Sequence, residues 1–402
     1  MNTRRARFAL WFVTLALAGC RDAGDSTPIA APSFAAGDVG RPWVLVNPNA
    51  DDHGTAKTIQ EGIAMVAEGG KVIVLPGTYT EAVVIDKGLT LEAVGGESGP
   101  VIVAPPGTAD PAILVATPDP VLIRGLTVHY SGFAGIRGLD LVDLTIERAT
   151  VMVVDPPLGQ SSLIVARTND ARVSGGRARL VVRNSTLDGA VTEDVALLPT
   201  FAQVFGITVG SDIDATLEGN VIRHTGGACI LLITRPDLAG ETNAEIVGND
   251  LDQCHAFGRV AAIVAGPPAP LPPGPRPIPV TATGTVNVVG NTIHNSSASC
   301  LATNAIHYEF FTGRIEHNRI LTVVPACALP NLRTLPGAIW VGAIRPFSGP
   351  AAAPVVRFND IEGNAQAGLR VGPNITASID ASCNWWGSAS GTSCRKIGRA
   401  HV

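Results

Sequence analysis

The sequence has little charge, it lacks basic clusters beyond its first seven residues, and its repeated segments lack helical periodicity. Only 16% of its 402 residues are charged, and after Arg7 lysine and arginine form no runs in a chain of net charge −5. Nucleic-acid binding leaves a basic patch in a sequence, so we expect no nucleic-acid partner. The repeated apolar segments follow no helical period, which excludes a solenoid built from helices. What remains is an aliphatic, turn-rich chain with 44 glycines and 30 prolines.

One short phrase recurs from residue 217 to residue 386. A β-forming pair is followed by asparagine, one further residue and an aliphatic residue, as in Leu217-Glu218-Gly219-Asn220-Val221-Ile222. Repeats with periods of about 20 to 50 residues indicate a solenoid, a propeller or an array. The asparagines that we assign to this repeat, 25 to 42 residues apart, are Asn184, Asn220, Asn249, Asn291, Asn318, Asn359 and Asn384.

A stack of short coils would explain why this motif repeats. Each strand would pair with the strands of the coils on either side, about 4.8 Å away. Asparagine tolerates the left-handed backbone of a sharp corner, and stacked asparagine amides can form a hydrogen-bonded ladder. The sequence at this point resembles the right-handed parallel β-helix repeat proteins with the pectate-lyase-like fold. The resemblance implies an all-β fold, a right-handed parallel β-helix solenoid over residues 43–395, and it is specific for fold rather than for function.

The N-terminus has the features of an export signal. A basic segment precedes the apolar run Phe8–Leu17, which is too short to span a bilayer as a stable helix. Leu17–Cys20 then resembles the lipobox of bacterial lipoproteins; an ordinary secretory signal is the alternative. The resemblance implies a signal peptide over residues 1–19, lipidation of Cys20 and a flexible lipid-anchored linker over residues 20–42. Arg21 after the cysteine favours the outer membrane, so we expect an exported cell-envelope lipoprotein that contacts the membrane only through its lipid anchor.

A short amphipathic helix is expected at the start of the solenoid. Ile59, Ile63 and Val66 share one helical face, after Thr55 or Thr58 as the candidate N-cap. This segment resembles the N-terminal cap of many β-helix proteins. Its role is general, because an open solenoid end exposes unpaired strand edges that a helix can cover.

The cysteines predict disulfides rather than a metal site. Six remain besides Cys20, and no close Cys/His pair has zinc spacing, so we expect no metal and no other cofactor. Cys300 and Cys327 each lie nine residues after a repeat asparagine, and Cys229 and Cys254 lie nine and five residues after theirs. Equal offsets on adjacent coils would bring the Cα atoms within the distance that a disulfide needs. We therefore predict Cys300–Cys327 and Cys229–Cys254, with Cys383–Cys394 closing the last turn.

The C-terminal region holds a closing motif and then loses the repeat. Cys383-Asn384-Trp385-Trp386-Gly387 resembles the last turn of many such proteins, where the tryptophans cap the core; a sugar-stacking platform is the alternative. Residues 396–402 follow no pattern and match a translated reading frame of a common sequencing adapter. Our hypothesis is that these residues are a non-native tail.

Candidate chemistry lies on the outward face of the repeat. The third residue after each asparagine points outward, and on three successive coils it is Arg223, Asp252 and His294. An arginine could bind the carboxylate of an acidic sugar, while Asp252 or His294 transfers a proton as a catalytic residue. A solvated face of mixed charge is the alternative, because ion pairs between neighbouring strands need no function.

Several features argue against the familiar polysaccharide-active enzymes. The sequence shows no column of three carboxylates for calcium and no paired-Asp, Gly-His-Gly and Arg-x-Lys set, and its aromatic content is only 5%. We therefore favour a non-catalytic, exported, monomeric protein that binds a polysaccharide or another cell-envelope component. The alternatives are a polysaccharide lyase, glycoside hydrolase or epimerase acting on an acidic glycan, and a structural spacer or adhesin.

Overall fold

The structure, a computed structural model, describes most of the chain after residue 39. The described residues are 40–49, 55–95, 99–105, 111–140, 142–155, 159–167, 177–191, 202–233, 241–254, 261–266, 284–298, 304–321, 324–325, 337–342, 353–363, 367–372, 375 and 377–387. The expected signal peptide, Cys20, nearly all of the linker, the C-terminal tail, Cys300, Cys327 and Cys394 lie outside these residues. Among the described residues, no helix has the length and apolar character needed to cross a membrane.

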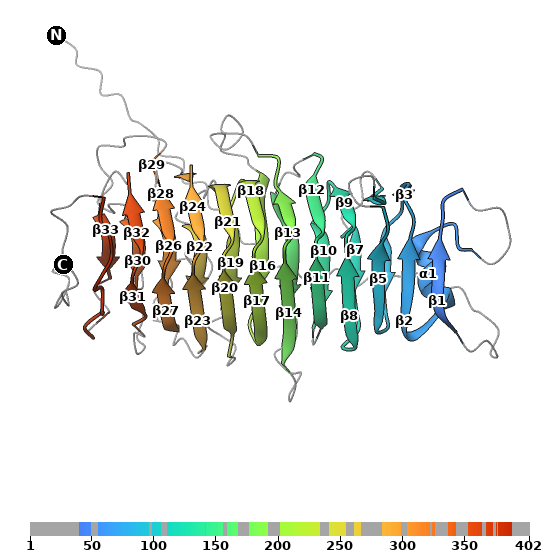
Figure 1. Ribbon diagram of the computed structural model, residues 1–402, viewed down its shortest axis with the longest axis horizontal. Coiled ribbons are helices and arrows are strands. Elements are labelled where there is room, and N and C mark those ends of the chain that lie inside the picture. Colours follow the sequence, from blue (N-terminus) through green and yellow to red (C-terminus); the bar gives the residue numbers. More distant parts are fainter. Residues whose placement is uncertain are drawn as a thin grey trace, which may run out of the picture. The chain divides into compact units, whose positions relative to one another are not determined.

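Three long parallel sheets, which we call A, B and C, contain almost all of the described strands (Figure 1). Sheet A comprises β1 (Arg41–Val46), β2 (Val66–Val74), β5 (Leu89–Ala93), β8 (Pro120–Arg124), β11 (Asp143–Glu147), β14 (Ala178–Arg183), β17 (Ile213–Glu218), β20 (Asn243–Val247), β23 (Thr285–Val289), β27 (Thr312–Glu316) and β31 (Val355–Arg357).

The other two sheets have the same order along the chain. Sheet B comprises β3 (Thr78–Thr80), β6 (Val101–Val103), β9 (Thr127–Tyr130), β12 (Thr150–Val153), β15 (Thr186–Asp188), β18 (Val221–Thr225), β21 (Asp250–Cys254), β24 (Thr292–His294), β28 (Arg319–Leu321) and β32 (Asp360–Glu362). Sheet C comprises β4 (Val83–Ile85), β7 (Ile113–Val115), β10 (Ala134–Leu139), β13 (Gly159–Arg167), β16 (Ala202–Val209), β19 (Ile230–Ile233), β22 (Ala261–Gly266), β26 (Asn304–Tyr308), β30 (Gly337–Val341) and β33 (Ala367–Val371). A small separate pair consists of β25 (Ser297–Ala298) and β29 (Val324–Pro325).

The chain visits sheets A, B and C in turn, so each circuit is one coil. Each strand pairs in parallel with the equivalent strands of the coils before and after it, as for β14 between β11 and β17. Side chains alternate between the two faces of a strand, and the inward ones form stacked aliphatic columns that fill the core. On sheet A one such column contains Val182, Leu217, Ile246, Val288 and Ile315, all fully buried. The fold is the predicted right-handed parallel β-helix.

A buried asparagine ladder runs along the corner between sheets A and B. Nδ2 of Asn291 donates to the Ile246 carbonyl at 2.8 Å and to Oδ1 of Asn318 at 3.0 Å, and the same Oδ1 accepts the backbone N–H of Asn291. The same bonds link each step of the series Asn220, Asn249, Asn291, Asn318, Asn359 and Asn384. Each amide therefore provides hydrogen-bond partners for backbone groups at the corner, where the chain leaves the hydrogen-bond ladders of the sheets.

Asn184 does not belong to this ladder, and the prediction for it was wrong by one residue. Ser185 occupies the ladder position, because its backbone N–H donates to Oδ1 of Asn220 at 3.1 Å. Asn184 aligns with Gly219 and has a left-handed backbone, with φ of 51°. The corner thus uses the residue before each ladder asparagine for the left-handed turn, whereas the asparagine itself supplies the hydrogen bonds.

The short helix at the start of the solenoid is α1 (Ile59–Met65), which contacts β1, β2 and β4. Thr58 is its N-cap, and Glu61 completes a capping box with it. The first helical N–H groups also donate to the Glu81 carboxylate, at 2.8 Å from Ile59 and 3.0 Å from Gln60. Ile59 and Ile63 are buried as expected, whereas Val66 is the C-cap and begins β2. The first strand, β1, begins at Arg41, two residues before the predicted start of the solenoid at residue 43.

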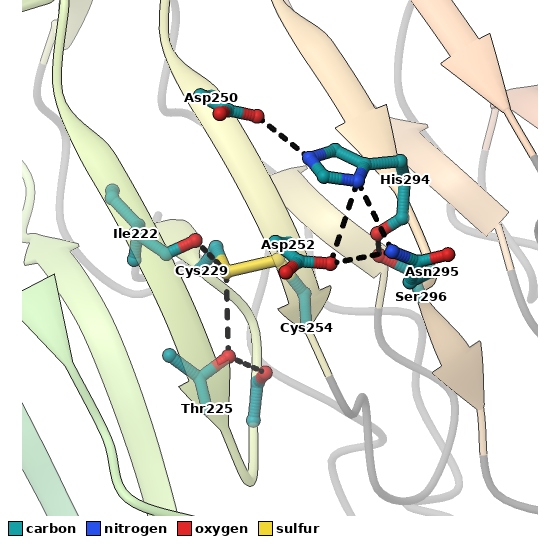
Figure 2. Close-up of a disulfide and its surroundings, with 10 residues drawn as sticks. Ile222, Thr225, Cys229, Asp250, Asp252, Cys254, His294, Asn295 and Ser296 are labelled. Atoms are coloured by element: carbon teal, nitrogen blue, oxygen red, sulfur yellow. Dashed lines mark hydrogen bonds and ion pairs between the residues drawn. A yellow bond between two sulfur atoms is a disulfide. The ribbon is translucent and has the colours of Figure 1, made fainter.

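The described residues contain the Cys229–Cys254 disulfide, with Cα atoms 5.5 Å apart. Its geometry differs from a bond between equivalent positions, because Cys254 aligns with Thr225 on β18 and not with Cys229. The bond instead joins the end of β21 to the segment that leads from β18 into β19, where Thr225 Oγ1 lies 3.4 Å from Cys229 Sγ (Figure 2). Cys383 also forms a disulfide.

The two tryptophans of the closing motif have different surroundings. Trp386 packs against the hydrophobic core, and a Cβ on Gly368 would lie 2.2 Å from its ring. Trp385 continues the stack through a bridge to Asp360 but leaves 46% of its surface exposed. Only Trp386 therefore packs against the core as expected.

The ladder generates a stability prediction. Asn291→Ala leaves the buried N–H groups of Asn249 without their acceptor, and each unpaired group costs about 1–3 kcal/mol. We expect a loss of at least about 2 kcal/mol, seen as a lower urea midpoint by circular dichroism. The matched control is Asn287→Ala in the preceding strand, β23, whose amide bonds Glu245 on the outer face and should change stability by no more than about 0.5 kcal/mol. Equal effects of the two substitutions would contradict a structural role for the ladder.

Candidate functional site

The expected trio lies on three successive strands of sheet B. Arg223 on β18 aligns with Asp252 on β21, which aligns with His294 on β24. Their Cα atoms therefore follow one another at about the strand spacing of 4.8 Å. The row also extends one strand upstream, because Asp188 on β15 aligns with Arg223.

Arg223 turns away from Asp252 and pairs with Asp188. Its Nε donates to Asp188 Oδ2 at 2.9 Å, and His224 Nδ1 lies 3.0 Å from Asp188 Oδ1. Burial alone raises the pKa of the Asp188 carboxyl, but hydrogen bonds from the Ala190 N–H, His224 and Arg223 outweigh burial and hold that pKa below its usual range. Asp188, Arg223 and His224 thus form one group with an ionised carboxylate at its centre.

Asp252 and His294 belong to a second group (Figure 2). His294 Nε2 lies 2.7 Å from Asp250 Oδ1, and its Nδ1 lies 3.2 Å from Asn295 Nδ2 and 3.5 Å from Asp252 Oδ1. Asn295 Nδ2 also donates to Asp252 Oδ1 at 3.0 Å. These contacts match an imidazole that donates from Nε2 to Asp250 and accepts at Nδ1. Within the described part of the chain, no three His, Cys, Asp or Glu side chains are grouped to hold a metal ion.

Asp188 was absent from the predicted row of outward residues because of the one-residue error at Asn184. Counting three residues from Asn184 reaches Leu187, which is buried in the core, whereas counting from Ser185 reaches Asp188. The signal was available in the sequence, since Ser185-Thr186-Leu187-Asp188 matches Asn220-Val221-Ile222-Arg223 when serine is accepted at the ladder position.

A hollow lies on the outer face of sheet A, over β5, β8, β11 and β14. Its volume is about 560 Å³, and it extends toward the loops that precede β5 and β8. The outward side chains Thr90, Leu122 and Thr145 align across the strands and line it. The remaining lining residues include Glu68, Asp119, Pro120, Arg124, Asp143, Glu147, Arg179 and Arg183. The sequence did not predict this site, because all of its lining residues lie upstream of the first repeat asparagine.

Charges of alternating sign follow one column beside the hollow. Arg124 lies between Glu92, at 3.5 Å, and Glu147, at 2.9 Å, and Glu147 also pairs with Arg183. Burial alone raises the pKa of the Glu147 carboxyl, but its hydrogen bonds from Arg183 and Arg124 outweigh burial and lower that pKa. Since both arginines are partly exposed, the column also offers N–H donors to a ligand in the hollow.

The pairing also balances the charge of the hollow. Arg179 lies 3.0 Å from Asp143 on the adjacent strand, so the arginines of the lining stand beside carboxylates. Such a surface presents fixed donors and acceptors without a strong net field. It is suited to polyhydroxylated ligands more than to a highly charged one.

Comparisons with known proteins find solved structures of similar fold. No protein-family model and no curated protein matches the chain. GH136 lacto-N-biosidase from Eubacterium ramulus is 12% identical, with a TM-score of 0.42, over 86% of this chain and 67% of its own. A pectin methylesterase in complex with hexasaccharide VII is 12% identical, with a TM-score of 0.33 and coverages of 82% and 80%. The A-module of the Azotobacter vinelandii mannuronan C-5 epimerase AlgE4 is 14% identical, with a TM-score of 0.32 and coverages of 77% and 91%. No activity follows from likenesses of this degree.

The lowered pKa of Asp188 predicts how stability depends on pH. A carboxyl whose folded pKa is depressed stabilises the fold above its unfolded pKa of about 3.9, and that contribution is lost as pH falls through the folded value. We expect Asp188→Asn to lower the melting temperature at pH 7 and to reduce its decline below about pH 4. Asp86→Asn, at an exposed aspartate, is the control and should follow the wild type. If the melting temperatures of the wild type and of Asp188→Asn changed with pH in the same way, Asp188 would not have the lowered pKa that we assign to it.

Proposed function

We propose that this protein is an exported β-helix that binds a polysaccharide or another cell-envelope glycan in the hollow on sheet A. The observation that carries the proposal is a hollow of about 560 Å³ on paired strands, whose lining combines paired charged groups with the apolar side chains of Leu122 and Pro120. Ligand sites in proteins commonly have volumes of about 300–1,000 Å³. A rigid sheet holds the donors and acceptors in place, so binding costs little ordering of the protein.

The lining favours a glycan of low charge. Arg124, Arg183 and Arg179 already have carboxylate partners, and they retain N–H groups for further hydrogen bonds. Leu122 and Pro120 provide apolar contacts for the C–H faces of a sugar ring. A surface that pairs its own charges gains little from binding a polyanion, whereas it can exchange water for sugar hydroxyls.

Export and anchoring belong to the same proposal. The lipobox-like segment ending at Cys20 supports a lipid-anchored envelope protein with the β-helix held off the membrane. The Cys229–Cys254 disulfide is compatible with an oxidising compartment outside the cytoplasm.

Filling the hollow should abolish binding. Thr145→Trp places a large side chain on the outward face within the hollow, so retention on an immobilised polysaccharide should fall at least about tenfold. The control is Thr216→Trp, because Thr216 lies in the same outward column of sheet A, on β17 and outside the hollow. A panel of neutral and acidic polysaccharides serves as the probe. Unchanged retention of Thr145→Trp would overturn the proposal, and failure of the wild type to bind any polysaccharide would favour a spacer or adhesin.

An enzyme acting at the sheet B row is the second candidate, and the position of His294 favours it. The contacts to Asp250 and Asn295 hold its imidazole in one orientation, as a proton-transferring histidine requires. Arg223 would bind the carboxylate of an acidic glycan, and Asp252 or His294 would transfer the proton in a lyase, hydrolase or epimerase.

This second candidate predicts turnover that depends on the row. With acidic polysaccharides, new reducing ends or unsaturated products should appear with the wild type and fall at least about a hundredfold in Asp252→Asn and His294→Gln. Arg319→Gln on the same face of sheet B is the control and should retain activity. Epimerisation is followed by NMR of the polymer. An absence of all these products with the wild type would exclude catalysis at the sheet B row.

A further inference from the structure

Exposed aromatic rings gather at the corner between sheets A and B, beside β27, β28, β31 and β32 (Figure 1). His317 follows β27 and Phe358 follows β31, and their rings stack with centroids 5.2 Å apart and planes 9° apart. His317 is exposed, and Phe358 leaves 45% of its surface exposed. Trp385, which is 46% exposed, follows on the next coil. We call these three residues the aromatic corner.

The backbone at this corner suits glycine better than an aromatic residue. Each of the three preceding coils turns the corner with a glycine in the left-handed conformation, at Gly219, Gly248 and Gly290, with φ between 61° and 66°. His317 and Phe358 occupy the same position with φ of 57° and 56°. A bulky side chain is disfavoured there, and backbone strain of this kind is concentrated at functional positions. Because both rings are exposed, core packing does not explain their presence.

The charges around the stacked rings alternate in sign. On one coil Glu316 precedes the corner and Arg319 follows it; on the next coil Arg357 precedes the corner and Asp360 follows it. Glu316 aligns with Arg357, and Arg319 aligns with Asp360. Opposite charges therefore alternate both along the corner and across it. The Arg319 and Asp360 side chains are 60% and 41% exposed, and the Arg357 guanidinium lies 5.6 Å from the centroid of the Phe358 ring.

This pattern discriminates between possible partners. Two cations and two anions leave the four positions without net charge, so an anionic lipid surface or a polyanion gains little electrostatic attraction. The pattern is instead complementary to a second copy of itself. A two-fold rotation about an axis that runs parallel to the strands, between the two coils, places each coil opposite the other coil of the second copy. Arg319 then faces the second copy's Asp360, and Glu316 faces its Arg357.

The same rotation brings the aromatic rings together. His317 faces the second copy's Phe358, so rings meet at the centre and opposite charges meet on either side of them. Aromatic residues and arginine are enriched at the centres of protein interfaces, where they contribute most of the binding energy. Charged pairs around such a centre fix the orientation of the two partners.

We propose that the aromatic corner is the centre of a homodimer interface in which the two solenoids are antiparallel. A two-fold interface uses the same surface of both copies and closes at two subunits. A standard stable interface buries about 1,600 Å² in total, which three partly exposed rings do not approach, so the dimer is weak. It replaces the monomer expected from the sequence. The interface lies on other coils than the hollow on sheet A, and it does not depend on glycan binding.

Sedimentation velocity of the whole chain tests the dimer, with Cys20→Ser in all samples so that no lipid is attached. Over a rising concentration series the mass should approach twice that of the monomer and then stay constant. Phe358→Gly should weaken association at least about tenfold. It should leave the melting temperature of the dilute protein close to that of the wild type, because glycine adopts this left-handed backbone without strain.

Arg148→Gly is the matched control, because Arg148 is an exposed corner residue with φ of 51° on an upstream coil. This substitution should leave the dimer intact. A wild-type surface that stays monomeric or grows beyond a dimer would overturn the proposal. So would undiminished association of Phe358→Gly.

A charge swap tests the geometry of the interface. Arg319→Glu and Asp360→Arg should each weaken the dimer at least about tenfold, because each places like charges opposite one another. An equal mixture of the two variants should dimerise again, since position 319 of one variant then faces an opposite charge at position 360 of the other. Circular dichroism and melting curves check that both variants fold. If the folded variants did not associate on mixing, the proposed arrangement would be refuted.

Discussion

The parallel pairing of each strand with its equivalents in the neighbouring coils is the constraint on which the rest of the structure depends. Because the register is preserved from coil to coil, a residue type repeated in the sequence becomes a column in space. Inward columns of Val, Leu and Ile form the core, and the buried asparagines from Asn220 to Asn384 form a continuous hydrogen-bonded ladder beside it. Core packing and corner hydrogen bonding therefore support the same register.

The same register gives the outer faces of the three sheets different chemistry. On sheet A, alternating Glu and Arg side chains pair across adjacent strands beside a hollow. On sheet B, two polar groups form around Asp188 and around His294. On sheet C, the outward positions of neighbouring strands include buried Leu231 and Val264 before the column reaches His307 and Trp340. One repeated backbone can thus present several unrelated surfaces, which is why the fold alone does not identify a function.

An error of one residue in the register of a coil changes which side chains are assigned to its outer face. The repeat predicts five coils of the ladder correctly, from the phrase that contains Asn220 to the one that contains Asn359, and Asn384 closes it. At the upstream end serine replaces asparagine, and choosing Asn184 instead of Ser185 moved every outward residue of that coil by one position. Asp188 was lost from the predicted row for that reason alone. The Cys229–Cys254 bond shows a related limit, since it joins positions that are not equivalent in their coils.

The sequence by itself determined the fold class, the column of asparagines, the capping helix and the alignment of Arg223, Asp252 and His294, because all of these follow from the repeat and from the two-residue period of a strand. Only the tertiary structure decided which charged groups pair. Arg223 lies between Asp188 and Asp252 and bonds the former, since side-chain rotamers and local hydrogen bonds choose between neighbours that the register leaves equivalent. The hollow on sheet A and the stacking of His317 on Phe358 likewise depend on burial and on side-chain direction. These properties arise from contacts between coils and loops that no repeat pattern specifies.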